Sequence, residues 1–361
     1  MKQKPITNQN LKSFQNKLLI WYKESHRKLP WRNAENSYHI WVSEVMLQQT
    51  QVETVRQYYD KFIQKFPTVT VLAKADLQEV LKIWEGMGYY SRARNLHRAA
   101  KIVVEKMGGE VPADFYQFRK LPGVGSYIAA AVQSIAFHQP YAVVDGNVKR
   151  VLARLLAINT PVNDAKSSRV FQDKASKMLD LTNPGMFNQA LMELGALVCK
   201  PQNPFCQRCP VTQFCKTFKT TSTDKFPVRH RRRPIPQYHI AVGVVYKNGK
   251  TLITKRKEKG LLGGLWEFPG GKIKNGETAQ QACIREIKEE VNLEVEVLSH
   301  LTQVKHAYTH FKIVMEVFRC RYVSGRIKLN GAVDYRWIKF TEIEKYPFPK
   351  ANHKFIPLLQ K

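Results

Sequence analysis

The chain has 361 residues, and its 43% hydrophobic content allows a sizeable core and excludes global disorder. Its 58 Lys and Arg residues outnumber 29 Asp and Glu residues, so the formal net charge of +29 favours a polyanionic partner, above all nucleic acid. Because no stretch approaches the ~20 apolar residues needed to cross a bilayer, an anionic membrane is the weaker alternative. The N-terminal sequence MKQKPITNQNLKSFQ lacks an apolar signal core, which predicts a cytoplasmic protein of bacterial type, associated with the nucleoid.

The pattern of apolar residues changes once along the chain. Residues 11–215 contain segments with apolar residues at helical spacing, such as NVKRVLARLLAI. The stretch 217–237 is basic and contains three prolines, which indicates a linker, and its run Arg229–Arg233 is either a phosphate contact or a solvated tether. From residue 238 the period becomes two, with an Asn248-Gly249 turn between strands. We therefore expect a helical domain at 1–216, a linker at 217–237 and an α+β domain at 238–361.

The stretch LPGVGSYIAAAV, at 121–132, places two glycines directly before a helix-forming run. Gly123 and Gly125 permit close backbone approach, and free amides at a helix N-terminus bind a phosphate oxygen. An ordinary helix–turn–helix in a core is the alternative. Further along, VVDGNVKRV places Asp145 at a helix start, where an Asp commonly caps the helix.

LPGVG followed by VDGNVKRV resembles the hairpin and the catalytic aspartate of the helix–hairpin–helix DNA glycosylase superfamily, over about residues 12–216. Within it, PWR, WVSEVMLQQTQVETV, GMGYYSRARNL and FNQALMELGALVC are similar to the MutY-type adenine DNA glycosylases. That resemblance implies an all-α glycosylase domain with its hairpin at 121–127. It also implies removal of adenine mispaired with 8-oxoguanine or guanine, and a double-stranded DNA partner carrying such mispairs.

Glu44 has apolar neighbours in the sequence, namely Val42, Val45, Met46 and Leu47. Its carboxyl therefore faces either solvent, on an amphipathic helix, or a pocket. In a pocket, desolvation would raise its pKa and keep it protonated, so that it could donate to a purine nitrogen. The resemblance implies that Glu44 protonates adenine and helps to activate water. It also implies that ionised Asp145 stabilises the sugar cation, with Asn147 orienting the Asp or the water.

Tyr127 stands where bifunctional relatives such as endonuclease III carry a Schiff-base lysine. Because a phenol cannot form an imine, the resemblance implies a monofunctional glycosylase that leaves an abasic site. The nearby Lys120 and Lys149 leave weak lyase activity open, and a bifunctional glycosylase/lyase is one alternative function.

Further residues match the family's DNA-contacting positions. The resemblance implies that Gln49 and Tyr89 enter the base stack, supported by Gln48 and Thr50. It implies that Trp31, Arg32 and Gln189 line the adenine pocket; core packing is the ordinary role of such aromatic residues.

Cys199, Cys206, Cys209 and Cys215 have the spacing C-x6-C-x2-C-x5-C, which from spacing alone suits zinc or a [4Fe–4S] cluster. The same spacing is that of the cluster loop of endonuclease III and the MutY type, at 199–215 here, so the resemblance favours one [4Fe–4S] cluster. The loop would press on the DNA backbone, with Lys200 and Arg208 as candidate contacts.

GGKIKNGETAQQACIREIKEEVNL resembles the Nudix box, in which Asn292 replaces the final Gly. Glu286, Glu289 and Glu290 could bind Mg²⁺, so the domain is either a scaffold that reads 8-oxoguanine or a MutT-like nucleotide pyrophosphohydrolase. We favour the scaffold. HAYTHFKI aligns with the family's loop that contacts 8-oxoguanine, which implies Tyr308, Thr309 and His310 for that contact.

The prediction is therefore a multidomain, monomeric, monofunctional adenine DNA glycosylase of base excision repair, with an all-α helix–hairpin–helix domain and an α+β Nudix-like domain. Two alternatives explain less of the sequence. A non-catalytic, metal-bearing DNA-binding protein leaves Glu44 and Asp145 unexplained, and a pyrophosphohydrolase leaves the helical part as a tether.

Overall fold

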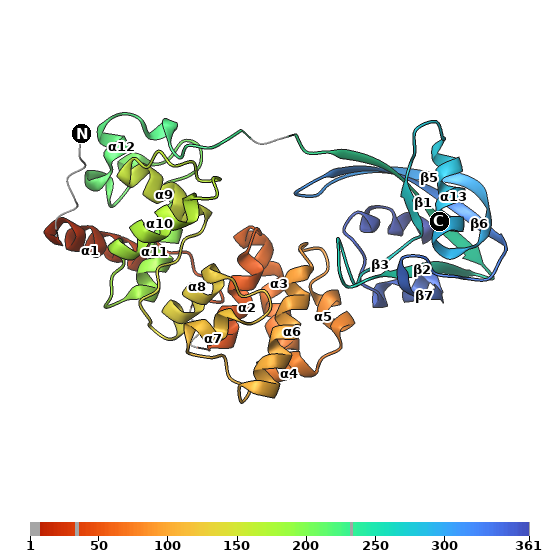
Figure 1. Ribbon diagram of the computed structural model, residues 1–361, viewed down its shortest axis with the longest axis horizontal. Coiled ribbons are helices and arrows are strands. Elements are labelled where there is room, and N and C mark those ends of the chain that lie inside the picture. Colours follow the sequence, from red (N-terminus) through yellow and green to blue (C-terminus); the bar gives the residue numbers. More distant parts are fainter. Residues whose placement is uncertain (1–7, 33–35, 232–233, 361) are drawn as a thin grey trace. The chain divides into compact units, whose positions relative to one another are not determined.

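The computed structural model describes residues 8–32, 36–231 and 234–360. The chain forms two compact units (Figure 1). The helical unit comprises Met1–Ala73 and Arg98–Arg232, and the C-terminal unit comprises Lys74–His97 and Arg233–Lys361. Within the described residues, no helix combines the length and the apolar character that a membrane crossing requires.

The helical unit is built from short helices and single turns. These are α1 (Asn8–Ser25), α2 (Ser37–Leu47), α3 (Val52–Lys65), α4 (Val69–Lys74), the C-terminal part of α6 (Ser91–Lys106), α7 (Phe115–Arg119), α8 (Ser126–Ala136), α9 (Gly146–Leu156), α10 (Ser167–Met178), α11 (Pro184–Leu197), η1 (Cys206–Arg208), η2 (Thr212–Phe214), α12 (Lys216–Lys219) and η3 (Thr223–Lys225).

Helix α11 organises the core of this unit, packing on α1, α8 and α9. The apolar residues at helical spacing in NVKRVLARLLAI form one face of α9, and this face is buried in the cluster that α11 completes: Val148, Val151, Leu152 and Leu155. Two glycines of α11 permit the close approach: a Cβ at Gly185 would lie 2.5 Å from the carbonyl oxygen of Ser134 on α8. A Cβ at Gly195 would lie 2.6 Å from the Cβ of Asn147 on α9. The start of α9 is therefore held firmly against α11.

The first part of the expected linker at 217–237 is tied to the helical unit. The amide of Val162 donates to the carbonyl of Val228 at 2.9 Å, and Asn163 exchanges two hydrogen bonds with the backbone of His230. A solvated tether therefore does not describe this stretch up to His230. Of the basic run Arg229–Arg233, positions 232 and 233 lie outside the described residues.

The C-terminal unit contains a seven-stranded sheet of order β3-β2-β1-β6-β5, in which β4 pairs with β1 and β7 with β2. Its elements are α5 (Leu77–Ile83), the start of α6, β1 (Gln237–Lys247), β2 (Lys250–Arg256), β3 (Trp266–Glu267), β4 (Gly270–Lys272), α13 (Ala279–Val291), β5 (Glu294–Ala307), β6 (Lys312–Ser324), β7 (Ala332–Ile338), η4 (Phe340–Lys345), η5 (Asn352–Lys354) and η6 (Ile356–Gln360).

Strand β1 lies at the centre of the sheet, parallel to β6 and antiparallel to β2 and β4. Its side chains alternate between two cores, with Val242 and Val244 in one and Ala241 and Val245 in the other. The second core contains α13, which packs on β1 and begins with a capping box at Thr278. The predicted Asn248-Gly249 turn has positive φ at both residues, 49° and 71°, as a two-residue hairpin requires.

The segment Lys74–His97 belongs to the C-terminal unit because polar contacts tie it there, although the sequence places it in the range 1–216. The indole of Trp266 donates to Oε1 of Gln78 at 2.9 Å, and Nη1 of Arg94 donates to the carbonyl of Gly263 at 2.6 Å. The carboxylate of Glu85 accepts the amide of Phe348 at 2.6 Å.

Candidate active site

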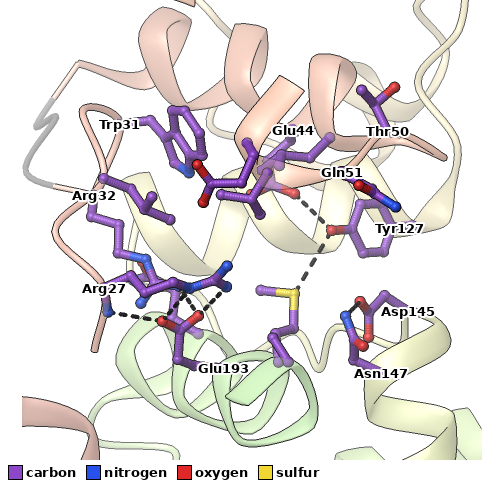
Figure 2. Close-up of a pocket in the computed structure, with 17 residues that line it drawn as sticks. Arg27, Trp31, Arg32, Glu44, Thr50, Gln51, Tyr127, Asp145, Asn147 and Glu193 are labelled. Carbon is purple, nitrogen blue, oxygen red and sulfur yellow. Dashed lines mark hydrogen bonds and ion pairs between the residues drawn. The ribbon is translucent and has the colours of Figure 1, made fainter. Parts of the chain in front are cut away.

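A cavity of about 370 Å³ opens in the helical unit, where α2, α8, α9 and α11 meet (Figure 2). It brings together residues that lie far apart in the sequence. The lining consists of Arg27, Leu29, Trp31, Arg32, Glu44, Leu47, Thr50, Gln51, Val52, Glu53, Tyr127, Asp145, Asn147, Gln189, Met192, Glu193 and Ala196.

Glu44 lies on α2, a helix whose start is capped by Asn36, and its side chain faces the cavity with 5% exposure. The pKa of Glu44 is raised to about 7, mainly by desolvation and in addition by the nearby charge of Asp145. A hydrogen bond from Tyr127 and the charge of Arg32 act in the opposite direction. Near neutral pH this carboxyl can therefore hold a proton and release it.

Asp145 is the N-cap of α9, so the capping role and a place in the cavity coincide. Its Oδ1 accepts a hydrogen bond from the amide of Val148 at 2.6 Å. Its Oδ2 accepts one from Nδ2 of Asn147 at 2.9 Å (Figure 2). Burial raises the pKa of Asp145 above its ordinary value, although these hydrogen bonds and the charge of Arg150 act in the opposite direction. Asp145 thus has acceptor contacts that favour its ionised form, which Glu44 largely lacks.

Tyr127 connects the hairpin to the carboxyl of Glu44. Gly123 has φ 77°, a conformation that favours glycine, and Gly125 is the N-cap of α8. Two residues later, the hydroxyl of Tyr127 donates to Oε2 of Glu44 at 2.8 Å and lies 3.7 Å from Sδ of Met192. Burial raises the pKa of Tyr127 well above its ordinary value, so the phenol keeps its proton as a donor.

Glu193 and Arg27 complete the site and were not predicted from the sequence. The carboxylate of Glu193 is buried and accepts three hydrogen bonds from Arg27, through its amide, Nε and Nη2, and one from Nη2 of Arg32 at 2.6 Å. These partners lower the pKa of Glu193, against its burial. The sequence signal that could have identified Glu193 is its position as the one acidic residue in the largely apolar segment FNQALMELGALVC.

The other predicted pocket residues lie beside this pair. Trp31 is buried at 6% exposure, in edge contact with Tyr59. Oε1 of Gln189 accepts a hydrogen bond from the hydroxyl of Tyr22 at 3.3 Å. The same hydroxyl accepts a hydrogen bond from Nη1 of Arg32 at 2.6 Å. Thr50 also lines the cavity.

Gln49 follows the C-cap of α2, Gln48, and is exposed with φ 55°, a strained backbone conformation for a non-glycine residue. The structure therefore places Gln48 and Gln49 at the end of α2, just before the cavity-lining Thr50.

The remaining predicted DNA contacts belong to the C-terminal unit. Tyr89 has φ 50°, and its hydroxyl donates to Oγ1 of Thr309 at 2.5 Å. Thr309 and His310 are exposed in the turn between β5 and β6. The ring of Tyr308 stacks on that of Phe311, with the two centroids 4.7 Å apart.

The four cysteines of 199–215 are free and half-buried at the edge of the helical core. Nη1 of Arg154 lies 3.4 Å from Sγ of Cys199, and Nε of Arg150 donates to the carbonyl of Cys199 at 2.7 Å. In the described part of the chain, no three His, Cys, Asp or Glu side chains are gathered to hold one metal ion. Burial raises the pKa of Cys206 and Cys209, and the nearby thiols of Cys199 and Cys215 raise it as well, so the four thiols lie in one neighbourhood. Four cysteine thiolates are the donor set of a [4Fe–4S] cluster, so these residues fit that group.

Arg150 also connects this loop with the catalytic side of α9. Its Nη2 donates to Oδ1 of Asn147 at 2.8 Å and to the carbonyl of Gly195 at 2.7 Å. A continuous set of hydrogen bonds therefore runs from the backbone of Cys199 through Arg150 and Asn147 to Asp145.

Comparisons with known proteins agree with this architecture. Residues 42–177 match the family described as HhH-GPD superfamily base excision DNA repair protein, and residues 241–358 match the NUDIX domain. An adenine DNA glycosylase of Rattus norvegicus is 38% identical over 95% of this chain and 77% of its own length. The adenine DNA glycosylase of Homo sapiens is 37% identical over 85% of this chain and 66% of its own length.

Two solved structures resemble the helical part. A thermostable thymine-DNA glycosylase is 29% identical with a TM-score of 0.55, covering 60% of this chain and all of that one. A trapped endonuclease III–DNA covalent intermediate is 25% identical with a TM-score of 0.52, covering 60% of this chain and 99% of that one.

Proposed function

Because the chain belongs to the adenine DNA glycosylases, which are DNA N-glycosylases of base excision repair, we propose that it is a monofunctional enzyme that excises adenine mispaired with 8-oxoguanine or guanine. The observation that carries the proposal is the pair of carboxyls in one cavity, of which Glu44 has the pKa suited to a proton donor and Asp145 has the acceptor contacts of an anion.

Excision begins when adenine leaves the duplex and enters the cavity, at a cost of a few kcal/mol that mispairing lowers. Glu44 then protonates N7 of adenine, which makes the base a better leaving group. Its proton is available near neutral pH because burial raises the pKa to about 7, and the phenol of Tyr127 fixes the carboxyl's orientation. Arg27, Arg32 and Glu193 form the polar wall that orients the base.

As the glycosidic bond breaks, positive charge develops on the sugar. Asp145, held by the amide of Val148 and the side chain of Asn147, stabilises that cation as a fixed anion. Glu44, now ionised, assists the attack of water on the sugar.

The absence of strand cleavage follows from Tyr127. This phenol occupies the hairpin exit, where a lyase needs an amine, and its raised pKa keeps it a donor. Among the described residues that line the cavity there is no lysine. Nζ of Lys149 is engaged by Oγ of Ser167 at 3.0 Å.

For the lesion strand, we propose that Gln49 and Tyr89 fill the gap left by adenine, with Gln48 and Thr50 in support. Tyr308, Thr309 and His310 read 8-oxoguanine from the turn between β5 and β6, and the phenol of Tyr89 orients the hydroxyl of Thr309. Glycines 123 and 125 of the hairpin bring backbone amides close to a phosphate.

Cys199, Cys206, Cys209 and Cys215 would hold a [4Fe–4S] cluster, which when bound fixes the loop that carries Lys200 and Arg208 toward the DNA backbone. Arg154 and Arg150 contribute positive charge and hydrogen bonds beside Cys199.

The decisive assay uses duplexes that contain A opposite 8-oxoguanine, A opposite G, or A opposite T. Breaks in the adenine strand that require alkali, together with little covalent trapping by borohydride, are the expected result. Breaks without alkali and strong trapping would contradict the monofunctional assignment. Affinity should fall steeply with salt, because several phosphates are neutralised.

A further inference from the structure

The C-terminal unit carries a nearly complete Nudix box, and that fold implies a divalent cation held by its glutamates. The donor set that a cation would need is Glu286, Glu289 and Glu290 on α13, with Glu267 of β3 facing them. Whether these residues fit a cation is decided by what their oxygens already contact.

Two arginines, Arg256 and Arg285, already form hydrogen bonds with the carboxylate oxygens of Glu267, Glu286 and Glu289. Nη1 of Arg256 lies 2.7 and 2.6 Å from the two oxygens of Glu267, which it bridges. Nη1 of Arg285 donates to Glu286 at 2.8 Å and to Glu289 at 3.1 Å, and its other nitrogens hold both oxygens of Glu277 at 2.6 and 2.9 Å. Nζ of Lys274 lies 3.6 Å from Glu289.

The fourth carboxyl has a backbone partner. Oε2 of Glu290 accepts a hydrogen bond from the amide of Gly270 at 3.1 Å, so this oxygen is already engaged by the backbone of the loop. Gly271 lies so close to Glu286 that a Cβ there would collide with the carboxylate, so the backbone of this loop packs directly against α13.

The residues present therefore do not fit Mg²⁺. We propose that Arg256 and Arg285 replace the divalent cation of this fold. The Nudix box then binds no cation, and its side-chain contacts hold the Gly270–Glu277 loop against α13. Three polar contacts hold this loop in place of a metal ion. Glu277 accepts the amide of Lys274, Arg285 donates to the carbonyl of Lys272, and Glu290 accepts the amide of Gly270.

Of the two arginines, only Arg285 belongs to the Nudix box. Arg256 lies outside it, at the end of β2. It pairs with Glu267 across the β2–β3 ladder, and its Nε donates to the carbonyl of Leu261 at 3.1 Å. It therefore fixes the 257–264 loop as well as neutralising Glu267. Removing its charge should leave Glu267 and Glu290 facing each other without a cation.

The test measures Mn²⁺ binding to the full chain. Binding is detected as a loss of the EPR signal of free Mn²⁺. The native protein should take up no stoichiometric ion through this unit, whereas Arg256→Gln should take up about one Mn²⁺ per chain through the uncovered carboxylates. Arg321→Gln, which removes an exposed arginine paired with Glu296, is the matched control and should take up none. Arg256→Lys should also bind none, because it keeps a cation beside Glu267.

One Mn²⁺ bound by the native chain and lost in Glu290→Gln would overturn the proposal, as would an Arg256→Gln chain that binds no more Mn²⁺ than the native protein. If Arg256→Gln fails to fold, the double variant Arg256→Gln/Glu267→Gln decides by stability. Recovery of folding supports neutralisation by Arg256, and failure to recover contradicts it. Adenine excision is not the readout, so the result is independent of the proposed function.

Discussion

Replacement of Tyr127 by Phe tests how the acid of the site is tuned. The phenol donates to Oε2 of Glu44 at 2.8 Å and favours its ionised form. Without that donor the carboxyl should hold its proton to higher pH. Excision requires protonated Glu44, so the alkaline limb of the rate profile should move upward.

The size of the effect follows from the hydrogen bond. A hydrogen bond to a charged group contributes about 1.5–3 kcal/mol, and about 1.4 kcal/mol corresponds to one pH unit, so the limb should move by about one to two pH units. The assay is single-turnover release of adenine from an A:8-oxoguanine duplex, measured from about pH 5 to 10.

Tyr38→Phe is the matched control, because Tyr38 lies on the same helix and its buried hydroxyl donates to the carbonyl of Phe66 at 2.9 Å, away from Glu44. Its profile should keep the native alkaline limb. A Tyr127→Phe profile that coincides with the native one, or that moves to lower pH, would refute this account of the tuning.

Three further substitutions test other parts of the site. The pKa of Glu44 is raised from 4.5 to about 7, so its contribution to stability is complete below about pH 4.5 and is lost as the pH rises through about 7. Glu44→Gln should therefore gain stability over the native protein between pH 5 and 8, approaching about 3 kcal/mol, and equal unfolding midpoints at pH 8 would contradict this. Glu193→Gln should destabilise the fold by about 3 kcal/mol and slow excision, measured by denaturant unfolding and single turnover, since it weakens a buried carboxylate's contacts with two arginines. Arg150→Gln should slow excision by about tenfold at unchanged DNA affinity, because it frees Asn147; unchanged single-turnover rates would show that Asn147 holds its place without Arg150.

The chemistry of the site was largely predictable from the sequence, because its residues stand in short motifs. Glu44, Asp145 and Tyr127 were each singled out by their place in a helix or turn, and the structure brings all three into one cavity. That Glu44 faces the cavity and not solvent could not be read from its apolar neighbours, since an amphipathic helix allows either orientation.

Long-range contacts account for what the sequence did not predict. Arg27 and Glu193 are 166 residues apart, and nothing local pairs them. The stacking of Tyr308 on Phe311 could not be predicted either, because it depends on how the turn closes. The contact of Arg256 with Glu267 could not be predicted from the Nudix box either, because Arg256 lies outside the motif and meets Glu267 only through the β2–β3 pairing.

The central claim is that the carboxyl of Glu44 supplies the proton that releases adenine. Its most direct test is the single-turnover rate of Glu44→Gln on an A:8-oxoguanine duplex, with DNA affinity measured alongside. We expect the rate to fall by at least about 10²-fold while the duplex still binds with near-native affinity. Adenine release at the native rate by this variant would contradict the claim.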